Sequence, residues 1–154
     1  MYEKIVVPLD GSKVGEAALP YVEDIVSKLS PEVKTEIVLL QVVAPTTIPT
    51  TSGRTHSGIP YTEQQLEETE KKAMEYLNQT GKALKSKGVT VTAKVAVGDA
   101  SEHIVKVAEE IDANLIAMST HGRSGFSRWA FGSVTDKVLR REGRIPVAMI
   151  RAPR

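Results

Sequence analysis

Strand-length runs of apolar residues alternate along this sequence with segments of helical period, and this alternation constrains the fold more than any other feature. The strand-like runs lie at residues 5–9, 37–43, 89–97, 115–118 and 147–150. Between them, apolar residues recur every three or four positions at residues 14–29, 66–84, 104–111 and about 133–141. An alternating β-α-β pattern predicts an α/β fold, an open parallel sheet of five strands with helices on both faces.

The composition of the strands predicts their order. Residues 37–43 are almost wholly apolar, as in a strand covered on both faces, whereas residues 89–97 alternate valine or alanine with more polar residues, as at an edge. This contrast favours the order 3-2-1-4-5 over the flavodoxin-type order 2-1-3-4-5. Winding then reverses between strands 1 and 4, and a ligand crevice is expected above their carboxyl ends. The loops at residues 10–12 and 119–132 meet there.

The length of 154 residues suits one domain, which we expect to span residues 1–154. One segment, residues 44–60, differs from the rest: it has no apolar period, and proline, glycine, threonine and serine dominate it. A segment of this kind inside a compact domain is a flexible connector or a functional lid, and we expect a flexible loop.

Charge and composition exclude several classes of function. Twenty Lys and Arg residues against nineteen Asp and Glu residues give a net charge of +1, which favours neither nucleic acid nor an anionic membrane as a partner. Aromatic residues make up only 5%, too few for a stacking platform on single strands. No apolar run approaches the roughly 18 residues that a membrane span needs. The absence of cysteine excludes disulfides and fits a cytoplasmic protein without a secretory signal.

The stretch from residue 118 to residue 134 combines glycines with a predicted helix start. A helix N-terminus presents unpaired N–H groups to a phosphate, and glycines such as Gly122 let an anion approach the backbone. Arg123 and Arg128 add charge-assisted contacts. The alternative is that Ser133, spaced three residues from Asp136, only caps its own helix. Neither a Walker A loop nor a G-x-G-x-x-G fingerprint is present.

The opening run from Lys4 to Ser12, the Gly98-Asp99 turn and the stretch from Met118 to Thr135 resemble the universal stress protein family over nearly the whole chain. ATP-binding members carry G-x2-G-x9-G-[ST] after the fourth strand, and Gly122, nine residues and Gly132-Ser133 match its later part. The first glycine position holds Ser119 instead. The resemblance implies an adenine-nucleotide-hydrolase-like, Rossmann-like fold with strand order 3-2-1-4-5 and a homodimer.

By position, the resemblance also implies a set of residues that bind the nucleotide. They are Pro8, Asp10, Val42, Met118, Ser119, Gly122, Arg123, Gly132, Ser133 and Val134. The Asp10 carboxylate would accept ribose hydroxyls, Val42 would wall the adenine, and the glycine loop would hold the phosphates through main-chain N–H groups. Gly98 is a weaker candidate at the rim. Without a ligand, Asp10 would instead cap the first helical turn, and Val42 would be a core valine.

No catalytic group is expected, so any hydrolysis should be slow. His56, His103 and His121 are not spaced as metal ligands. We expect His56 and His103 to be solvated or structural, and nothing pairs His121 with an orienting carboxylate. A receiver domain of this size would need an acidic pair after strand 1, and Asp10 stands alone. Metal is expected only as Mg²⁺ on the phosphates.

The sequence therefore predicts an ATP-binding stress-response regulatory module, with AMP or ADP as the other nucleotides. One alternative keeps the fold without a nucleotide, as a dimeric protein-interaction module, and Ser119 favours it. A true nucleotide-using enzyme is the third possibility, and the missing general base counts against it. Residues 147–150 should form a sheet edge through which two copies dimerise.

Overall fold

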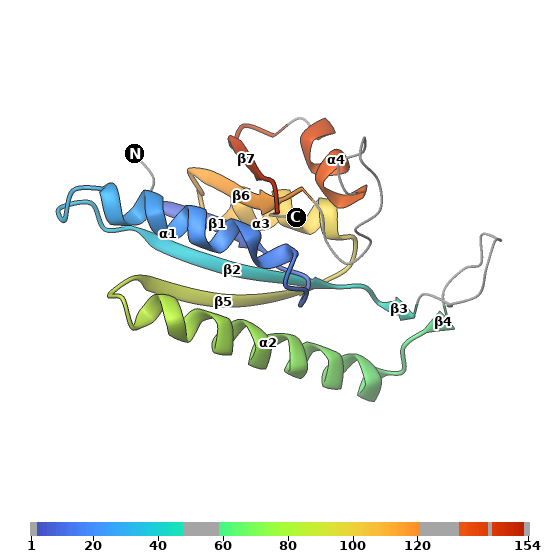
Figure 1. Ribbon diagram of the computed structural model, residues 1–154. Helices are drawn as coiled ribbons and strands as arrows, with labels where there is room; N and C mark the ends of the chain where they lie inside the picture. Colours follow the sequence, from blue (N-terminus) through green and yellow to red (C-terminus); the bar gives the residue numbers. More distant parts are fainter. Residues whose placement is uncertain (1–2, 48–58, 121–132, 142, 153–154) are drawn as a thin grey trace.

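The computed structural model of this chain, which describes residues 3–47, 59–120, 133–141 and 143–152, contains a five-stranded parallel sheet (Figure 1). Its strands are β1 (Lys4–Pro8), β2 (Glu36–Val43), β5 (Thr90–Val97), β6 (Leu115–Ser119) and β7 (Val147–Ile150). Their order is β5-β2-β1-β6-β7, and all four pairings are parallel. In chain order this is 3-2-1-4-5, so the predicted topology is confirmed.

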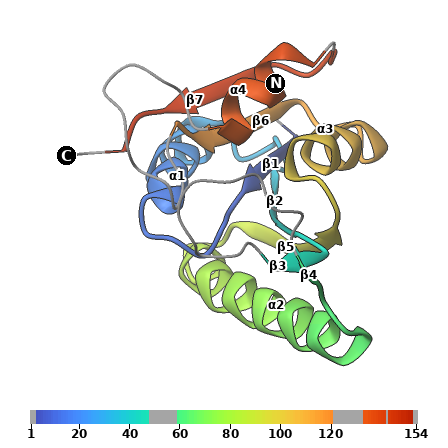
Figure 2. The ribbon, with the colours of Figure 1, turned by 90° about the vertical axis from the view of Figure 1, so that its right-hand side faces the viewer.

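The helices cover both faces of the sheet. The 3-10 turn η1 (Gly15–Ala17) leads into α1 (Ala18–Lys28), followed along the chain by α2 (Glu63–Lys85), α3 (Ala100–Glu110) and α4 (Ser133–Arg140). Side chains of α1 and α2 pack in one core cluster and side chains of α3 and α4 in another, on the opposite face. Figure 2 shows α1 and α3 on opposite sides of the strands.

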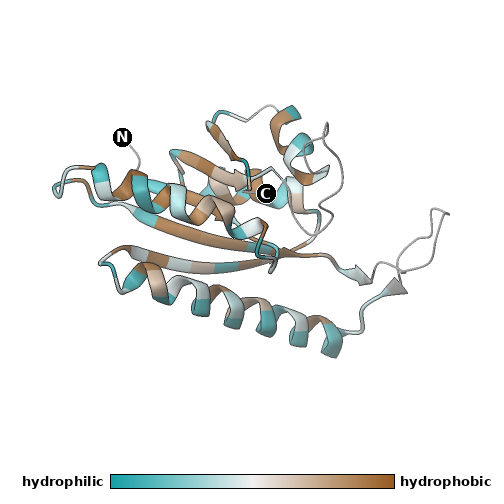
Figure 3. Ribbon diagram, in the orientation of Figure 1, coloured by the Kyte–Doolittle hydropathy of each residue, from teal (hydrophilic) through white to brown (hydrophobic). Residues whose placement is uncertain are grey.

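Burial along the two outermost strands on one side follows the sequence pattern. In β2, alternate residues enter the two clusters, with Ile37 and Leu39 on the α1/α2 face and Val38 and Leu40 on the α3/α4 face. Edge strand β5 pairs only with β2 in the sheet, and Val91 is its one buried residue. Figure 3 shows β2 as largely hydrophobic and α2 as rich in hydrophilic residues. A central strand therefore needs apolar residues on both faces, and an edge strand does not.

Two helices begin at side chains that accept backbone hydrogen bonds. Thr62 precedes α2 and forms a capping box with Gln65, since each side chain accepts a bond from the other's backbone N–H. Asp99 precedes α3 and accepts from the N–H of Glu102. These caps start the two helices at Glu63 and Ala100, before the residues at which the predicted apolar periods begin, Leu66 and Ile104. No helix in the described part of the chain has the length and apolar character to cross a membrane.

The segment 44–60 differs in part from the expected loop. Its ends form two short strands, β3 (Thr46–Thr47) and β4 (Ile59–Pro60), which pair antiparallel beyond the carboxyl edge of the main sheet (Figure 1). The N–H of Tyr61 donates to the carbonyl of Pro45 and continues the pairing. A ladder of two residues per strand is too short to produce a periodic pattern, so the sequence did not predict it. Residues 48–58 lie outside the described residues.

Candidate functional site

The carboxyl ends of β1 and β6 lie side by side at the point where the strand order reverses. Strand β1 pairs with β2 on one side and with β6 on the other, and η1, which follows β1, packs against β6. Parallel sheets of this type bind ligands above such a reversal. The structure therefore brings together the ends of the strands from which the two predicted loops leave.

Asp10 closes the turn that follows β1. Its Oδ1 accepts hydrogen bonds from the backbone N–H of Ser12 at 2.9 Å and from the Ser12 hydroxyl at 2.6 Å. Ser12 Oγ in turn accepts from the N–H of Gly15 at 3.0 Å. A Cβ on Gly15 would lie 2.5 Å from Asp10 Oδ1, so only glycine allows this close approach. The residue before η1 is Val14, which has no side-chain cap, and the Asp10 carboxylate closes the turn at Ser12.

Tyr76 and Glu16, which the sequence analysis missed, connect this turn to α2. The Tyr76 hydroxyl donates to Glu16 Oε1 at 3.0 Å, and Lys13 Nζ lies 2.9 Å from Glu16 Oε2. Burial, the hydrogen bond to Glu16 and the nearby carboxylate charges raise the pKa of Tyr76 well above its usual value. The Asp-Gly-Ser sequence indicates the turn itself, since Asp side chains close such turns. No sequence signal links Tyr76 to it.

Three predicted site residues share the α3/α4 face of the sheet near its carboxyl edge. Val42 is half-buried and packs against the core cluster of this face, to which the buried Met118 belongs. Pro8 follows Val6 by two residues on β1 and so faces the same side. Met118 is only 5% exposed, so its side chain is a core residue first and a candidate pocket floor second.

The end of β6 is tied to the start of α4. The buried Thr135 hydroxyl donates to the Ser119 carbonyl at 3.1 Å, and the N–H of Thr120 donates to the Ile150 carbonyl at 2.9 Å. Ser119 itself is 7% exposed. Ser133 is the exposed first residue of α4, and Val134 packs partly buried against the α3/α4 cluster. Ser119, Ser133 and Val134 therefore belong to one connected region.

Several predicted positions fall outside the described residues. They are Gly122, Arg123, Arg128, Gly132, His56 and His121.

The predicted rim at Gly98 is a compact turn between β5 and α3. Gly98 has φ +145°, a conformation that other residues rarely adopt, and a Cβ there would also force the His103 ring to move. His103 Nδ1 faces the Asp99 carbonyl at 3.0 Å. Asp99 Oδ1 accepts from the Ser101 hydroxyl at 2.6 Å, and this bond, the Glu102 N–H and nearby Lys137 and Arg141 lower its pKa. Gly98, Asp99 and His103 thus have structural roles here.

Among the described residues, no group of three or more His, Cys, Asp or Glu side chains could hold a metal ion.

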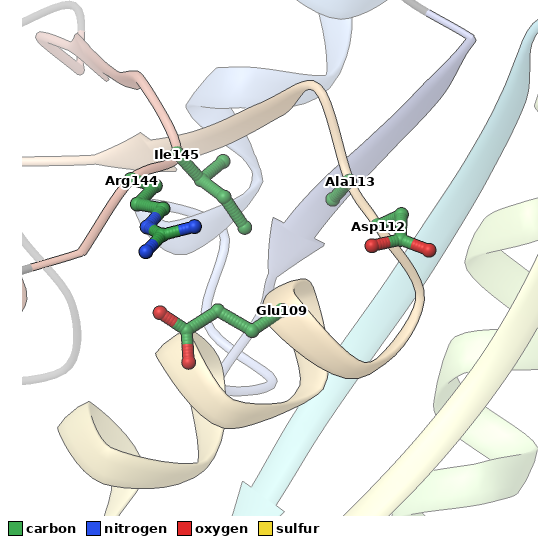
Figure 4. A pocket seen from close by; sticks show the side chains of 5 residues that line it. All are labelled: Glu109, Asp112, Ala113, Arg144 and Ile145. Atoms are coloured by element: carbon green, nitrogen blue, oxygen red, sulfur yellow. The ribbon is translucent and has the colours of Figure 1, made fainter.

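A cavity of about 500 Å³ lies at the opposite edge of the sheet, beside the amino ends of β6 and β7 (Figure 4). Ala113 and Ile145 form its apolar lining, and Glu109, Asp112 and Arg144 supply charges of both signs. In Figure 4 the charged ends of Glu109 and Arg144 lie on one side of it and Asp112 lies on the other. The sequence analysis did not predict this cavity, because its lining comes from the end of α3 and the two segments before β6 and β7, which share no motif.

Comparison with known proteins extends over the whole chain. The universal stress protein family model matches residues 1–151. Universal stress protein MJ0577 of Methanocaldococcus jannaschii is 28% identical over 160 residues, which cover 98% of this chain and 96% of that protein. The solved structure of MJ0577 superposes with a TM-score of 0.74 at 25% identity, covering 99% of this chain and 98% of that one.

Two further solved structures carry ligands. The universal stress protein from Archaeoglobus fulgidus in complex with dAMP has a TM-score of 0.63 and 20% identity, with 97% of this chain and 98% of that chain covered. A universal stress protein in complex with cAMP has a TM-score of 0.67 and 18% identity, with 97% of each chain covered. These likenesses agree with the fold. The chain therefore belongs to the universal stress protein family.

Proposed function

We propose that this protein binds an adenine nucleotide, ATP or alternatively AMP or ADP, at the carboxyl ends of β1 and β6, and that it acts as a stress-response regulatory module. Asp10 would accept the ribose hydroxyls, and Pro8 and Val42 would contact the adenine. Met118 and Ser119 would form the floor. Any hydrolysis would be slow, because the sequence offers no candidate general base.

The observation that carries this proposal is the pinned Asp10 turn at the reversal of strand order. Its carboxylate is held by two hydrogen bonds from Ser12 and is partly exposed, so its position is defined before any ligand arrives. A preorganised acceptor loses less entropy on binding a hydroxyl than a mobile one. The half-buried Val42, on the α3/α4 face of the sheet, offers an apolar surface of the kind that a purine base requires.

The phosphates would be held by main-chain N–H groups at Gly122, Arg123, Gly132, Ser133 and Val134. Ser133 and Val134 open α4, whose N-terminus carries the positive end of the helix dipole and favours an anion. A bound Mg²⁺ would neutralise phosphate charge. Because Ser133 is exposed and its helix is anchored to β6 through Thr135, the described part of this region fits such a ligand. The dAMP and cAMP complexes of structurally similar family members support the nucleotide class.

Isothermal titration of the protein with ATP and Mg²⁺ tests this function. We expect binding at submillimolar concentration, with little heat from GTP. Asp10→Ala should abolish most of the binding, whereas Asp24→Ala, which removes an exposed carboxylate paired with Lys28 on α1, should leave it unchanged. The absence of ATP binding at millimolar nucleotide would overturn the proposal.

A homodimer through β7 is proposed as the second partner interaction. Strand β7 ends the sheet order, Met149 on it is 36% exposed, and Leu139 on α4 is 40% exposed. An edge with open backbone groups and apolar side chains favours a second copy of the same edge. We also propose that residues 1–154 form one domain that works in the cytoplasm, as the cysteine-free sequence predicts.

The alternative function, a dimeric interaction module without a nucleotide, is favoured by one observation. Ser119 stands where ATP-binding members have glycine, and it is almost fully buried at the end of β6. Under this alternative, ATP would leave the melting temperature unchanged, since only a ligand that binds the folded state raises it.

A further inference from the structure

The turn that carries Asp10 depends on a contact made from a distant helix. Tyr76 lies in α2, 60 residues from Glu16 in η1, and its hydroxyl donates to Glu16 Oε1 at 3.0 Å. The 3-10 turn η1 also packs against β6 and continues into α1, and the Tyr76 bond adds a restraint from α2. The position of the turn is therefore set in part by α2.

A continuous series of contacts leads from Tyr76 to the Asp10 carboxylate. Glu16 is the chain neighbour of Gly15, whose N–H donates to Ser12 Oγ at 3.0 Å. The Ser12 hydroxyl donates to Asp10 Oδ1 at 2.6 Å. The Gly15 Cα also approaches this oxygen so closely that no Cβ fits between them. A shift of Glu16 would therefore move Gly15, and with it the group that holds Asp10.

The electrostatic surroundings favour a fixed donor at Tyr76. Its side chain is half-buried, and the charges of both Glu16 and Asp10 act on its hydroxyl. Burial, then the hydrogen bond to Glu16 and the charges of Glu16 and Asp10, raise the pKa of Tyr76, so the hydroxyl keeps its proton and remains a donor. Lys13 approaches the second oxygen of Glu16, but its side chain is 92% exposed and contributes little. The Tyr76 bond is thus the main restraint that the described residues place on the Glu16 carboxylate.

We infer that Tyr76 and Glu16 are positioning residues, which hold the Asp10 turn in the orientation that recognises the ribose hydroxyls of the nucleotide. This inference rests on the proposed function, because it assigns Asp10 to the ribose. It adds two residues on the α1/α2 side of the sheet to a site otherwise formed from the strand ends and α4. Their effect is specific: it reaches the ribose through Asp10 and leaves the phosphate contacts alone.

A bond that merely fastens α2 to η1 would behave differently. Loss of such a bond would lower the melting temperature and weaken the binding of every nucleotide by the same factor. A positioning bond weakens only ligands that use the ribose hydroxyls. The two roles separate when ATP is compared with 2′,3′-dideoxy-ATP, which keeps the base and the phosphates and lacks both hydroxyls.

The experiment measures the dissociation constants of ATP and 2′,3′-dideoxy-ATP, with Mg²⁺, for the wild type and its variants. Tyr76→Phe should weaken ATP binding about fivefold and leave the binding of the dideoxy analogue unchanged. Glu16→Ala should act in the same way, whereas Glu16→Gln, which retains an acceptor for the Tyr76 hydroxyl, should recover most of the ATP affinity. Tyr21→Phe is the matched control, since Tyr21 is an exposed tyrosine of α1. This variant should bind both ligands as the wild type does.

The outcomes separate this inference from the function beneath it. If the wild type binds neither ligand, the proposed function fails by itself. If the wild type prefers ATP and Tyr76→Phe keeps that preference in full, the protein recognises the ribose hydroxyls without the Tyr76 bond, and the positioning role is wrong. An equal loss for both ligands in Tyr76→Phe would also overturn it, as would a loss in Glu16→Gln as large as that in Glu16→Ala. Melting temperatures without nucleotide show that each variant is folded at the temperature of the titration.

Discussion

Asp10 and Asp99 close turns of the same form after two strands of the same sheet, but with different consequences. In each, Oδ1 accepts a hydroxyl hydrogen bond at 2.6 Å from the serine two positions later. Asp99 also accepts from the N–H of Glu102 and so begins α3, whereas the residue before η1 is Val14 and the second described bond to Asp10 Oδ1 comes from the N–H of Ser12. The role of Asp99 is therefore accounted for by the fold itself. The Asp10 turn is also held by local bonds from Ser12, and Asp10 is the residue that we propose for the ribose of a nucleotide.

A pH-dependent stability is predicted for Asp99. Its folded-state pKa is lowered by the Ser101 hydrogen bond first and by the Glu102 N–H next, so its charged form stabilises the fold above the ordinary pKa of about 3.9. This stability is lost as the pH falls through the folded pKa. Urea unfolding near pH 6 should show the wild type more stable than Asp99→Asn by about 0.5 kcal/mol, and the gap should close towards pH 3. A gap independent of pH would mean that charge plays no part.

A substitution at Gly15 is predicted to disturb both the fold and the site. In Gly15→Ala the new Cβ would overlap Asp10 Oδ1, so the carboxylate must move and the unfolding free energy should fall by about 2 kcal/mol. The rise in melting temperature that ATP produces should shrink as well. Gly143→Ala is the control, because the nearest atom to its Cβ would be Val105 Cγ1 at 3.6 Å, an ordinary contact, and it should change stability by under about 0.5 kcal/mol. Equal effects of both substitutions would contradict the crowding described at Gly15.

At the scale of elements, periodic patterns predict the main strands and the helices, while the ends of these elements depend on local contacts. Apolar periods mark α2 from Leu66 onward, but the capping box of Thr62 and Gln65 starts the helix at Glu63. The strands β3 and β4 carry no period because each has two residues. Patterns therefore predict an element when it buries a long face, and they miss it when backbone pairing alone defines it.

The link between β6 and α4 is predicted to support both stability and nucleotide binding. Thr135→Val keeps the shape of the side chain and removes the hydroxyl that donates to Ser119, which should cost about 1 kcal/mol in urea unfolding. Because α4 is then less firmly attached, the thermal shift produced by ATP should also diminish. Thr90→Val, at an exposed position at the start of β5, should do neither. A Thr135→Val protein as stable and as responsive as the wild type would remove this link from the site.

At the scale of the whole molecule, the strand order was predictable because two strands differ so clearly in composition. The order in turn predicts where the carboxyl ends meet, and hence which turns approach each other. The local turn at Asp10 is predictable from the Asp-Gly-Ser sequence, because both described hydrogen bonds to Asp10 Oδ1 come from Ser12. The contact of Tyr76 with Glu16 was not predictable, because it joins two elements 60 residues apart and a sequence pattern records only contacts within one element.

A dimer formed through β7 is predicted to dissociate when its edge is charged. Met149→Lys would place an ammonium group on the edge strand, where pairing with a second copy would bury it unpaired. Sedimentation at micromolar concentration should give twice the mass of one chain for the wild type and the mass of one chain for the variant. Tyr21→Lys places the same charge on exposed α1 and should leave the dimer intact. A wild type that sediments as one chain would reject the proposed interface.

The antiparallel pairing of Thr46 with Pro60 and of Thr47 with Ile59 has a consequence for engineering. It fixes the entry and exit points of the intervening stretch next to each other, away from the parallel sheet (Figure 1). Closing a longer excursion between two such fixed points adds little entropic cost, since that cost grows only slowly with length. Foreign peptides grafted between Thr47 and Ile59 should therefore be tolerated, which makes this corner of the molecule a natural place for tags or displayed epitopes.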